Sequence, residues 1–242
     1  MIRGMYSAAS ALVVASEQQE VTAHNLAHSS TPGYRERGLV VESFDRVLSR
    51  TLEPTGDITG ARAVRAFNDF RPGPVQKTEH PFDLALGEPD TFFVLAGPNG
   101  PVYTRNGAFN RNAQGQLVSQ GGYALQGDGG AITIPPDTTR VTIASDGSIT
   151  AADGQPLGQV RLVRFSAPQQ LTAAGPTLYA APPAAGLQPA QGRVLQGYRE
   201  GSNLDPATAM VRLIIGQRYY DAAQRALRSL AETVQLNTRP TG

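Results

Sequence analysis

The chain has 242 residues, of which 40% are hydrophobic, so it is long enough to bury a core and to form two domains. Its 21 basic residues nearly balance its 20 acidic ones, and a net charge of +1 argues against nucleic-acid binding, which needs a basic surplus or stripe. The sequence contains no cysteine, which excludes disulfides and thiolate metal sites.

The first expected element is a helix that runs from the N-terminus to residue 27 or 28. Its larger side chains recur every seven residues, at Met5, Leu12, Gln19 and Leu26. Small residues lie between them at Ala8, Ala15 and Thr22. Such a narrow seam is typical of a helix that packs against a partner helix. Helix-breaking residues at 29–33, with a proline-glycine turn, end the helix.

Glu20, His24 and His28 are spaced by four residues and therefore share one stripe of this helix. Two histidines and a carboxylate could ligate zinc. However, no glutamate follows His24 as in zinc proteases, and the remaining histidine, His80, precedes a proline. We therefore interpret the stripe as a polar surface that faces solvent or a neighbouring subunit.

The N-terminal segment has no signal-peptide cleavage pattern, and no stretch approaches the 18 apolar residues of a membrane span. The chain is therefore expected to be cytoplasmic or exported without a cleaved signal. From residue 37 to 75 the pattern is mixed, with a possible strand at 39–41 and a possible short helix at 44–48. We expect this region to be a connector beside the terminal helices.

Residues 76–202 are expected to form an antiparallel β domain. Short runs rich in β-branched and aromatic residues alternate with glycine-containing turns. The predicted strands are 83–86, 91–95, 102–105, 116–119, 123–126, 131–134, 140–144 and 159–165. The glycines of 127–130 resemble a phosphate loop, but no lysine follows and the next residues are strand-like, which favours a turn.

A second long helix is predicted from Asp205 to Val234, because Asp205 is a good N-cap, Pro206 fits the first turn, and no proline follows until Pro240. It repeats the seven-residue pattern at Pro206, Leu213, Tyr220, Leu227 and Val234. The interleaved positions are Ala209, Gly216, Ala223 and Leu230.

The fold class is therefore predicted to be α+β. The two terminal helices pair as an antiparallel coiled coil, and the central part of the chain forms an antiparallel β domain. An alternative is that both helices cover a sheet. The predicted domains are a helical polymerisation domain (1–36 and 203–242), a connector (37–75) and the β domain (76–202). In the antiparallel pair, Glu17 and Glu20 are expected to lie near Arg212 and Arg218 and to set the register.

Several motifs resemble those of the bacterial flagellar rod and hook proteins. The end of the first helix and the turn after it match the family at Asn25, Leu26, Ala27, Pro32 and Gly33. The entry and middle of the last helix match it at Asn203, Gln217, Arg218 and Tyr220. Runs such as 82–86, 92–94, 103–109 and 115–118 follow the family's middle domain in order. Departures occur at His24, His28, Ala209 and Asp221, where the family commonly has Asn, Asn, Glu and Glu.

This resemblance implies a structural subunit of the basal-body rod, proximal or distal, that polymerises into a helical tube and transmits torque. The implied partners are copies of itself, other flagellar axial proteins and the flagellar type III export apparatus, which secretes without a cleaved signal. No cofactor, metal or catalytic residue is implied, and no nucleic-acid or lipid binding is expected.

Three alternatives remain open. A hook subunit is one, although the chain has no long insertion for an extra outer domain. A secreted cell-wall-acting enzyme would need two converging carboxylates, for which Asp83, Glu88 and Asp90 are the nearest candidates, but all three lie beside turns. A membrane-active protein would need a basic polar face, whereas the first helix carries Glu17 and Glu20 against Arg3.

Overall fold

The computed structural model describes residues 2–43, 61–138 and 140–238. The fold is α+β, and the chain divides into two compact units. The helical unit contains residues 1–27, 37–68 and 205–242, and the β unit contains residues 28–36 and 69–204. Each unit is therefore built from segments that are far apart in the sequence.

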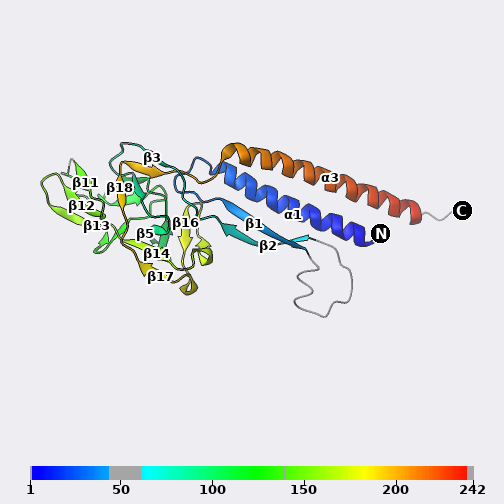
Figure 1. Ribbon diagram of the computed structural model, residues 1–242, viewed down its shortest axis with the longest axis horizontal. Helices are drawn as coiled ribbons and strands as arrows, with labels where there is room; N and C mark the ends of the chain where they lie inside the picture. Colours follow the sequence, from blue (N-terminus) through cyan, green and yellow to red (C-terminus); the bar gives the residue numbers. More distant parts are fainter. Residues whose placement is uncertain (1, 44–60, 139, 239–242) are drawn as a thin grey trace. The chain divides into compact units, whose positions relative to one another are not determined.

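The helical unit contains two long helices and one β-hairpin (Figure 1). Helix α1 is Ile2–Ala27 and helix α3 is Pro206–Thr238, so α3 is about 50 Å long at 1.5 Å per residue. The helices contact each other and run antiparallel, so that the start of α1 and the end of α3 lie at the same end of the pair (Figure 1). The Asp205 carboxylate accepts hydrogen bonds from the backbone N–H groups of Ala207 (3.3 Å) and Thr208 (3.2 Å), which confirms the predicted N-cap.

The hairpin consists of β1 (Arg37–Ser43) and β2 (Ala61–Asn68), which pair antiparallel with a register shift between Val40 and Val41. The predicted strand at 39–41 is thus part of β1, and the predicted helix at 44–48 lies outside the described residues. Helix α1 contacts both strands on one side and α3 on another, so it is the central layer of this unit (Figure 1). The hairpin belongs to the same compact unit as the helices.

The β unit is built from short antiparallel strands. They are β3 (Val75–Lys77), β4 (Leu84–Leu86), β5 (Thr91–Gly97), β6 (Gly100–Thr104), β7 (Phe109–Arg111), β8 (Leu117–Ser119), β9 (Gln126–Gly127), β10 (Gly130–Ala131), β11 (Val141–Ile143), β12 (Ser148–Ala151), β13 (Pro156–Gln159), β14 (Leu162–Phe165), β15 (Thr172–Ala173), β16 (Leu178–Ala180), β17 (Leu187–Pro189), β18 (Val194–Gln196) and β19 (Tyr198–Glu200). Two single-turn 3₁₀ helices, η1 (Pro168–Gln170) and η2 (Pro183–Ala185), interrupt them.

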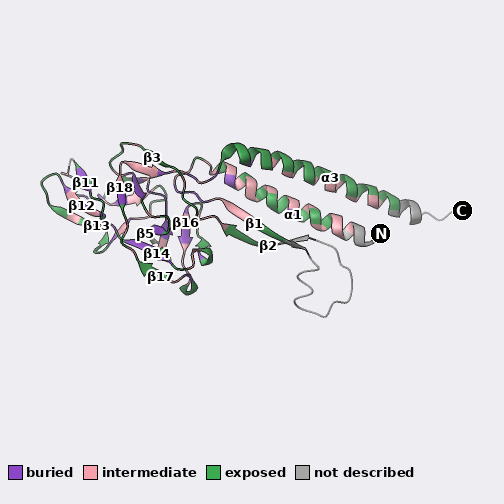
Figure 2. Cartoon of the chain, viewed as in Figure 1, coloured by how far each residue is buried: buried purple, intermediate pink, exposed green. Residues whose placement is uncertain are grey.

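The largest sheet has six strands in the order β15-β16-β6-β5-β14-β17. Strand β5 lies inside it and is buried on both faces, which explains why its sequence is almost continuously hydrophobic. Phe93 and Leu95 point into one core with Leu84 and Phe109, while Phe92 joins a second core. In that second core the rings of Tyr103 and Phe165 lie edge to face at 4.9 Å. These two cores hold most of the buried residues (Figure 2).

Most of the predicted strands are present, but their limits differ. The runs at 83–86, 91–95, 102–105, 116–119 and 140–144 correspond to β4, β5, β6, β8 and β11. The run at 159–165 is divided between the end of β13 and β14, and little of 123–126 and 131–134 is regular strand. The glycines at 127–130 form the β9–β10 hairpin, which confirms the turn interpretation. In the turns at Gly147 and Gly154 the glycines have positive φ values of 83° and 84°, which residues with a Cβ rarely adopt.

Candidate assembly interface

Most of the predicted seam positions of α3 are less exposed than the rest of that helix, but Pro206 is exposed. Ala209 is buried with 1% of its surface exposed, and the seam positions between 213 and 230 are half-buried while most of their neighbours are exposed (Figure 2). The half-buried positions are Leu213, Gly216, Tyr220, Ala223, Leu227 and Leu230. The side chain of Val234 lies outside the described set. One stripe of α3 therefore faces its neighbour, while the rest of its surface is open.

Helix α1 has two contacting faces. Its predicted seam residues Met5, Leu12, Gln19 and Leu26 are half-buried. A different face carries Asn25, with 4% of its surface exposed, whereas Val14, with 8% exposed, lies beside α3 residues such as Gly216. The Asn25 amide donates to the carbonyl of Arg37 (2.8 Å) and accepts from the Arg37 N–H (2.9 Å), so it fixes the start of β1 against the helix end. A hydrophobic repeat alone does not reveal this second face.

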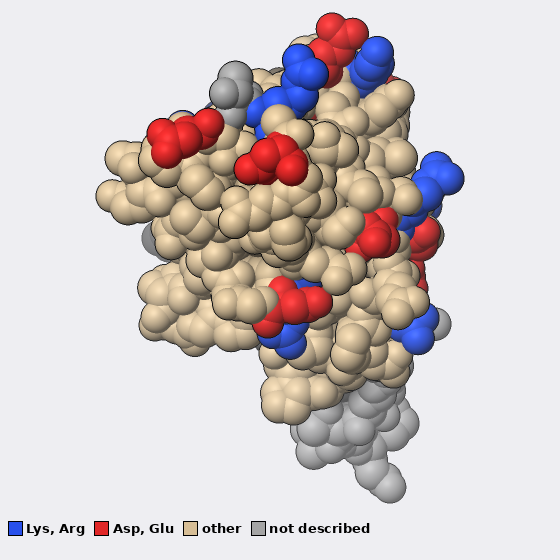
Figure 3. All heavy atoms as spheres, turned by 90° about the vertical axis from the view of Figure 1, so that its left-hand side faces the viewer, with Lys and Arg blue, Asp and Glu red and all other residues tan. Residues whose placement is uncertain are grey.

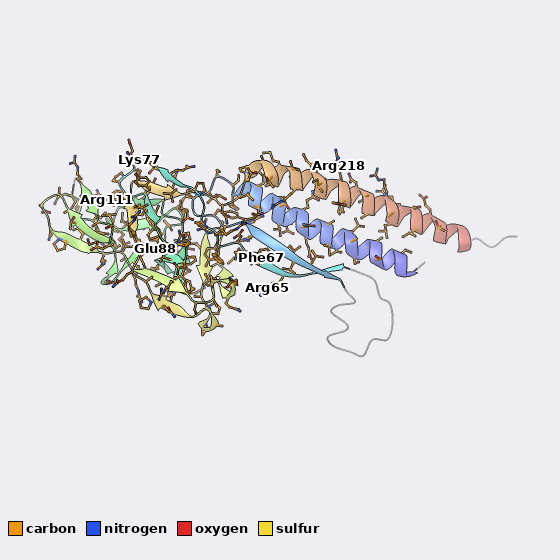
Figure 4. The ribbon with its side chains drawn as sticks, in the orientation of Figure 1. Arg65, Phe67, Lys77, Glu88, Arg111 and Arg218 are labelled. Carbon is orange, nitrogen blue, oxygen red and sulfur yellow. The ribbon has the colours of Figure 1, made fainter. Side chains whose placement is uncertain are left out.

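The predicted ion pairs across the seam are not formed. Glu17 and Glu20 are exposed and make no ion pair within the described part of the chain, so neither of them pairs with Arg212 or Arg218. In the seven-residue repeat these side chains occupy outward positions, whereas only the positions that flank the seam reach the partner helix. Figure 4 shows Arg218 on the side of α3 that faces away from α1. The prediction was wrong because it considered only how far along its helix each residue lies. It ignored the direction in which the side chain points from the helix.

The outward surface of α3 is aliphatic near its N-terminal end. Met210, Val211, Ile214 and Ile215 have 53%, 55%, 51% and 46% of their surfaces exposed. Beyond Ile215 the outward positions become charged, as at Arg218 and Arg225. Beside the seam, a groove of about 490 Å³ is lined mainly by small residues of both helices. Its lining is Ala11, Val14, Ala15, Gln18, Gly216, Tyr219, Ala222, Ala223 and Ala226.

Within the β unit, a buried ion cluster ties three distant segments together. The Glu200 carboxylate accepts hydrogen bonds from Arg35 (2.5 Å) and from the Nε and Nη2 of Arg105 (2.8 and 2.6 Å). It also accepts from the backbone N–H of Gly73 at 2.9 Å. All three charged residues have no more than 2% of their surface exposed. Burial lowers the pKa of Arg105 from its ordinary value, although Glu200 opposes this shift.

Two of the family-motif residues, Asn203 and Gly33, make further contacts between the segments that the buried ion cluster joins. Asn203 accepts a hydrogen bond from the Glu36 N–H (2.8 Å) and donates to the carbonyls of Asp69 (2.8 Å) and Arg71 (3.0 Å). Gly33 has a φ of +66°, and a Cβ at this position would approach the Asn106 nitrogen to 2.4 Å. The chain therefore needs glycine here for two reasons, conformation and space.

The other motif residues have various environments: Pro32 is half-buried, whereas Ala27 and Gln217 are exposed. Arg35, Arg105 and Glu200 were not predicted to form a site. No local pattern could have paired them, because Arg35 and Glu200 are 165 residues apart. A buried charge is recognised as such only when its partner is known.

Two of the carboxylates considered for enzyme chemistry, Asp83 and Glu88, make contacts within the β unit. Glu88 accepts a hydrogen bond from the Arg193 N–H at 2.6 Å, and Asp83 lies 3.8 Å from both His80 and Arg199.

Among the described residues no three potential metal ligands gather, and Glu20, His24 and His28 form no such group. None of the described helices is long and apolar enough to cross a membrane. On the face shown in Figure 3, acidic and basic side chains are interspersed on a mainly uncharged surface.

Three family models match separate parts of the chain. Residues 5–35 match "Flagella basal body rod protein", residues 88–151 match "Flagellar hook protein FlgE/F/G D1 domain", and residues 195–236 match "Flagellar basal body rod FlgEFG protein C-terminal". The first match contains most of α1, the last contains most of α3, and the middle one contains β5 and the strands that follow it to β12.

Similar proteins span nearly the whole chain. The flagellar basal-body rod protein FlgF of Escherichia coli is 32% identical over 95% of this chain and 94% of its own length. FlgF of Salmonella typhimurium is 31% identical over 96% and 95%. The rod protein FlgG of Caulobacter vibrioides is 29% identical over 98% and 99%.

Proposed function

The chain belongs to the flagellar basal-body rod protein family and is a structural subunit of that rod, and we propose that it assembles through its two terminal helices. In this proposal α1 and α3 pair as an antiparallel coiled coil, and the pairs stack side by side into a helical tube that transmits torque. The observation that carries it is the stripe of half-buried seam residues on α3, next to an outward surface that remains largely exposed.

The exposed apolar surface of the helices supports assembly with further copies. Four aliphatic side chains of α3 are about half exposed, and contiguous exposed apolar surface in a soluble protein commonly marks an interaction site. The seam residues Leu213, Tyr220 and Leu227 are only half-buried within one subunit. Further burial by neighbouring subunits would stabilise them by about 25 cal/mol per Å² of apolar surface removed from water.

The proposal extends to partners and location. Other axial proteins of the flagellum would contact the two ends of the rod segment, and the flagellar type III apparatus would export the chain without a cleaved signal. The family membership supports this. The near-zero net charge gives no support for a nucleic-acid or anionic-lipid partner.

A charge placed in the seam tests the proposal. Leu227→Asp is expected to abolish rod assembly and swimming, because an unpaired carboxylate would have to be buried between helices. The β unit should keep its cooperative unfolding transition, since Leu227 is not part of it. The measurements are electron microscopy of basal bodies, motility, and denaturant unfolding of the purified chain.

The matched control is Ser229→Asp, which adds the same charge to the same helix at an exposed position. It should leave assembly and swimming close to those of the unmodified protein. Rods assembled from Leu227→Asp protein, with normal swimming, would refute the coiled-coil interface.

A further inference from the structure

One side of the α1–α3 pair carries an open groove. Its volume is about 490 Å³, and both helices supply small side chains to it, such as Ala11, Ala222 and Ala226. The groove residues occupy positions c, d and g of the seven-residue repeats, when Met5 on α1 and Leu213 on α3 are position a. They therefore all lie on one side of the seam.

Two residues of this groove are not explained by packing inside one subunit. Glycine is among the least favourable residues inside a helix, yet a Cβ added at Gly216 would meet no heavy atom within 4 Å in the described part of the chain. Close approach of another chain would explain the glycine. Tyr219 has 69% of its surface exposed, and tyrosine is a frequent anchor of protein interfaces. Both residues indicate that the groove receives a partner.

The opposite side of the pair carries an exposed ridge on α1. The ridge consists of Ala9, Val13, Ser16 and Glu20, which occupy positions b and e of the repeat and are all exposed. Val13 is its one large apolar residue and has 58% of its surface exposed. Neither α3 nor the hairpin covers this ridge, so one subunit presents the groove and the ridge at the same time.

We propose that the groove of one subunit receives the α1 ridge of a second copy of this chain, with both copies oriented the same way. Because α1 and α3 are antiparallel, Val13 lies at about the same height along the helix pair as Ala222. A copy displaced sideways, with an axial shift of less than about one helical turn, sets its Val13 against Tyr219 and Ala222. The same ridge then passes Gly216 between Ser16 and Glu20.

Charges on the two surfaces support this orientation. Glu20 belongs to the ridge, and Arg212 occupies position g of α3, on the side of the seam that carries the groove. Their heights along the pair differ by about one helical turn, a distance that two long side chains can span. Both residues are exposed, so the ion pair fixes register and adds little affinity.

The contact joins different surfaces of like-oriented copies, so two subunits do not complete it. Each subunit keeps a groove on one side and a ridge on the other, and further copies can add in the same way. Such heterologous contacts build rings or open helical filaments. The α1–α3 seam is left intact. The inference rests on the proposed function and names the surfaces through which the helix pairs meet.

The absence of cysteine makes disulfide cross-linking a direct test. A chain carrying Val13→Cys and Ala222→Cys is assembled at high concentration and then oxidised mildly. Within one subunit these positions lie on opposite sides of the seam, so the disulfide must join two chains. We expect a ladder of covalent oligomers on a non-reducing gel, and mainly one heterodimer when the two single variants are mixed.

The matched control is Val13→Cys with Ser229→Cys, which moves the second cysteine by two turns, about 10.5 Å, along the same face of α3. A disulfide needs Cα atoms within about 7 Å of each other. The control chain should therefore give no ladder.

Gly216→Ala separates the groove contact from helix stability. Alanine is the better helix former, so the helical circular-dichroism signal of the dilute monomer should rise. The added methyl group occupies the groove, so the concentration needed for assembly, measured by sedimentation, should rise by at least about fivefold. Ser229→Ala, at an exposed position beyond the groove, should not raise that concentration.

Equal ladders in the test and control chains, or unimpaired assembly of Gly216→Ala, would overturn the groove contact. Neither result would affect the proposed assembly through the terminal helices as long as Leu227→Asp abolishes it. Normal assembly of Leu227→Asp would instead contradict the proposed function, so the two failures are distinguishable.

Discussion

At the scale of single residues, Glu200 has the most consequential contacts in the β unit. Glu200→Gln is expected to lower the free energy of unfolding by about 3–5 kcal/mol, because it leaves Arg35 and Arg105 buried without a counter-charge. Two Arg35 nitrogens, Nε and Nη1, already have no hydrogen-bond partner within the described structure. The measurement is urea unfolding of the purified chain at neutral pH.

The matched control is Glu79→Gln, which removes the same charge from an exposed pair. Glu79 lies 3.2 Å from Lys77, and the two side chains have 78% and 63% of their surfaces exposed. Its loss should cost less than about 1 kcal/mol. If the two variants unfolded at similar urea concentrations, the Glu200 cluster would not be the structural junction described here.

At the scale of elements, the N-cap of α3 gives a pH-dependent prediction. The Thr208 hydroxyl, followed by the Thr208 N–H, lowers the pKa of Asp205 from its ordinary value of 3.8. A lowered pKa in the folded state means that the stabilisation is present above pH 3.8 and is lost as pH falls through the folded value. Asp205→Asn keeps a capping oxygen but removes the charge. The helical signal in circular dichroism should therefore be larger for the unmodified chain than for Asp205→Asn at pH 6. The difference between the two chains should vanish near pH 2.

A difference between these two chains that stays constant from pH 6 to pH 2 would contradict a role for the Asp205 charge. Thr208→Val is a second check, because it removes the hydroxyl that contributes most to the lowered pKa. In Thr208→Val the stabilisation by the Asp205 charge should be lost at a higher pH, closer to the ordinary pKa of an aspartate.

Long elements and short elements differ in how well the sequence predicts them. The helices follow from seven-residue repeats that extend over more than 20 residues, and β5 follows from a compact run of aromatic and β-branched residues. Strands such as β15 and β17 could not be predicted, because they have two or three residues, all exposed, and so leave no hydrophobic pattern. Their pairing with β16 and β14 depends on tertiary structure.

The candidate interface shows the same limit. The seven-residue repeats indicated which residues of α1 and α3 occupy the seam positions, because the spacing of residues along a helix determines the face on which each side chain lies. The outward aliphatic face was missed because Ile214 and Ile215 were not assigned to repeat positions. The Glu200 cluster was missed because its members come from segments separated by 95 and 165 residues.

At the scale of the whole molecule, the two units differ in how they are stabilised. The β unit has two buried hydrophobic cores that include Phe92, Phe93 and Phe109. In the helical unit only Val14, Asn25 and Ala209 are fully buried among the described residues. The isolated helical pair therefore removes little apolar surface from water, and long helices without such packing are only marginally stable.

Hydrogen exchange on the dilute monomer should show this difference directly. Amides of α1 and α3 are expected to exchange fast, with protection well below that of β5, β6 and β14, because local opening of the helices exposes little apolar surface. On assembly the helices should become protected while the β unit changes little. The same measurement on the Leu227→Asp chain, which is expected to stay monomeric, should show fast helical exchange at every concentration. Equal protection of helices and β strands in the monomer would mean that the helical unit is stable by itself and that its half-buried seam is sufficient for folding.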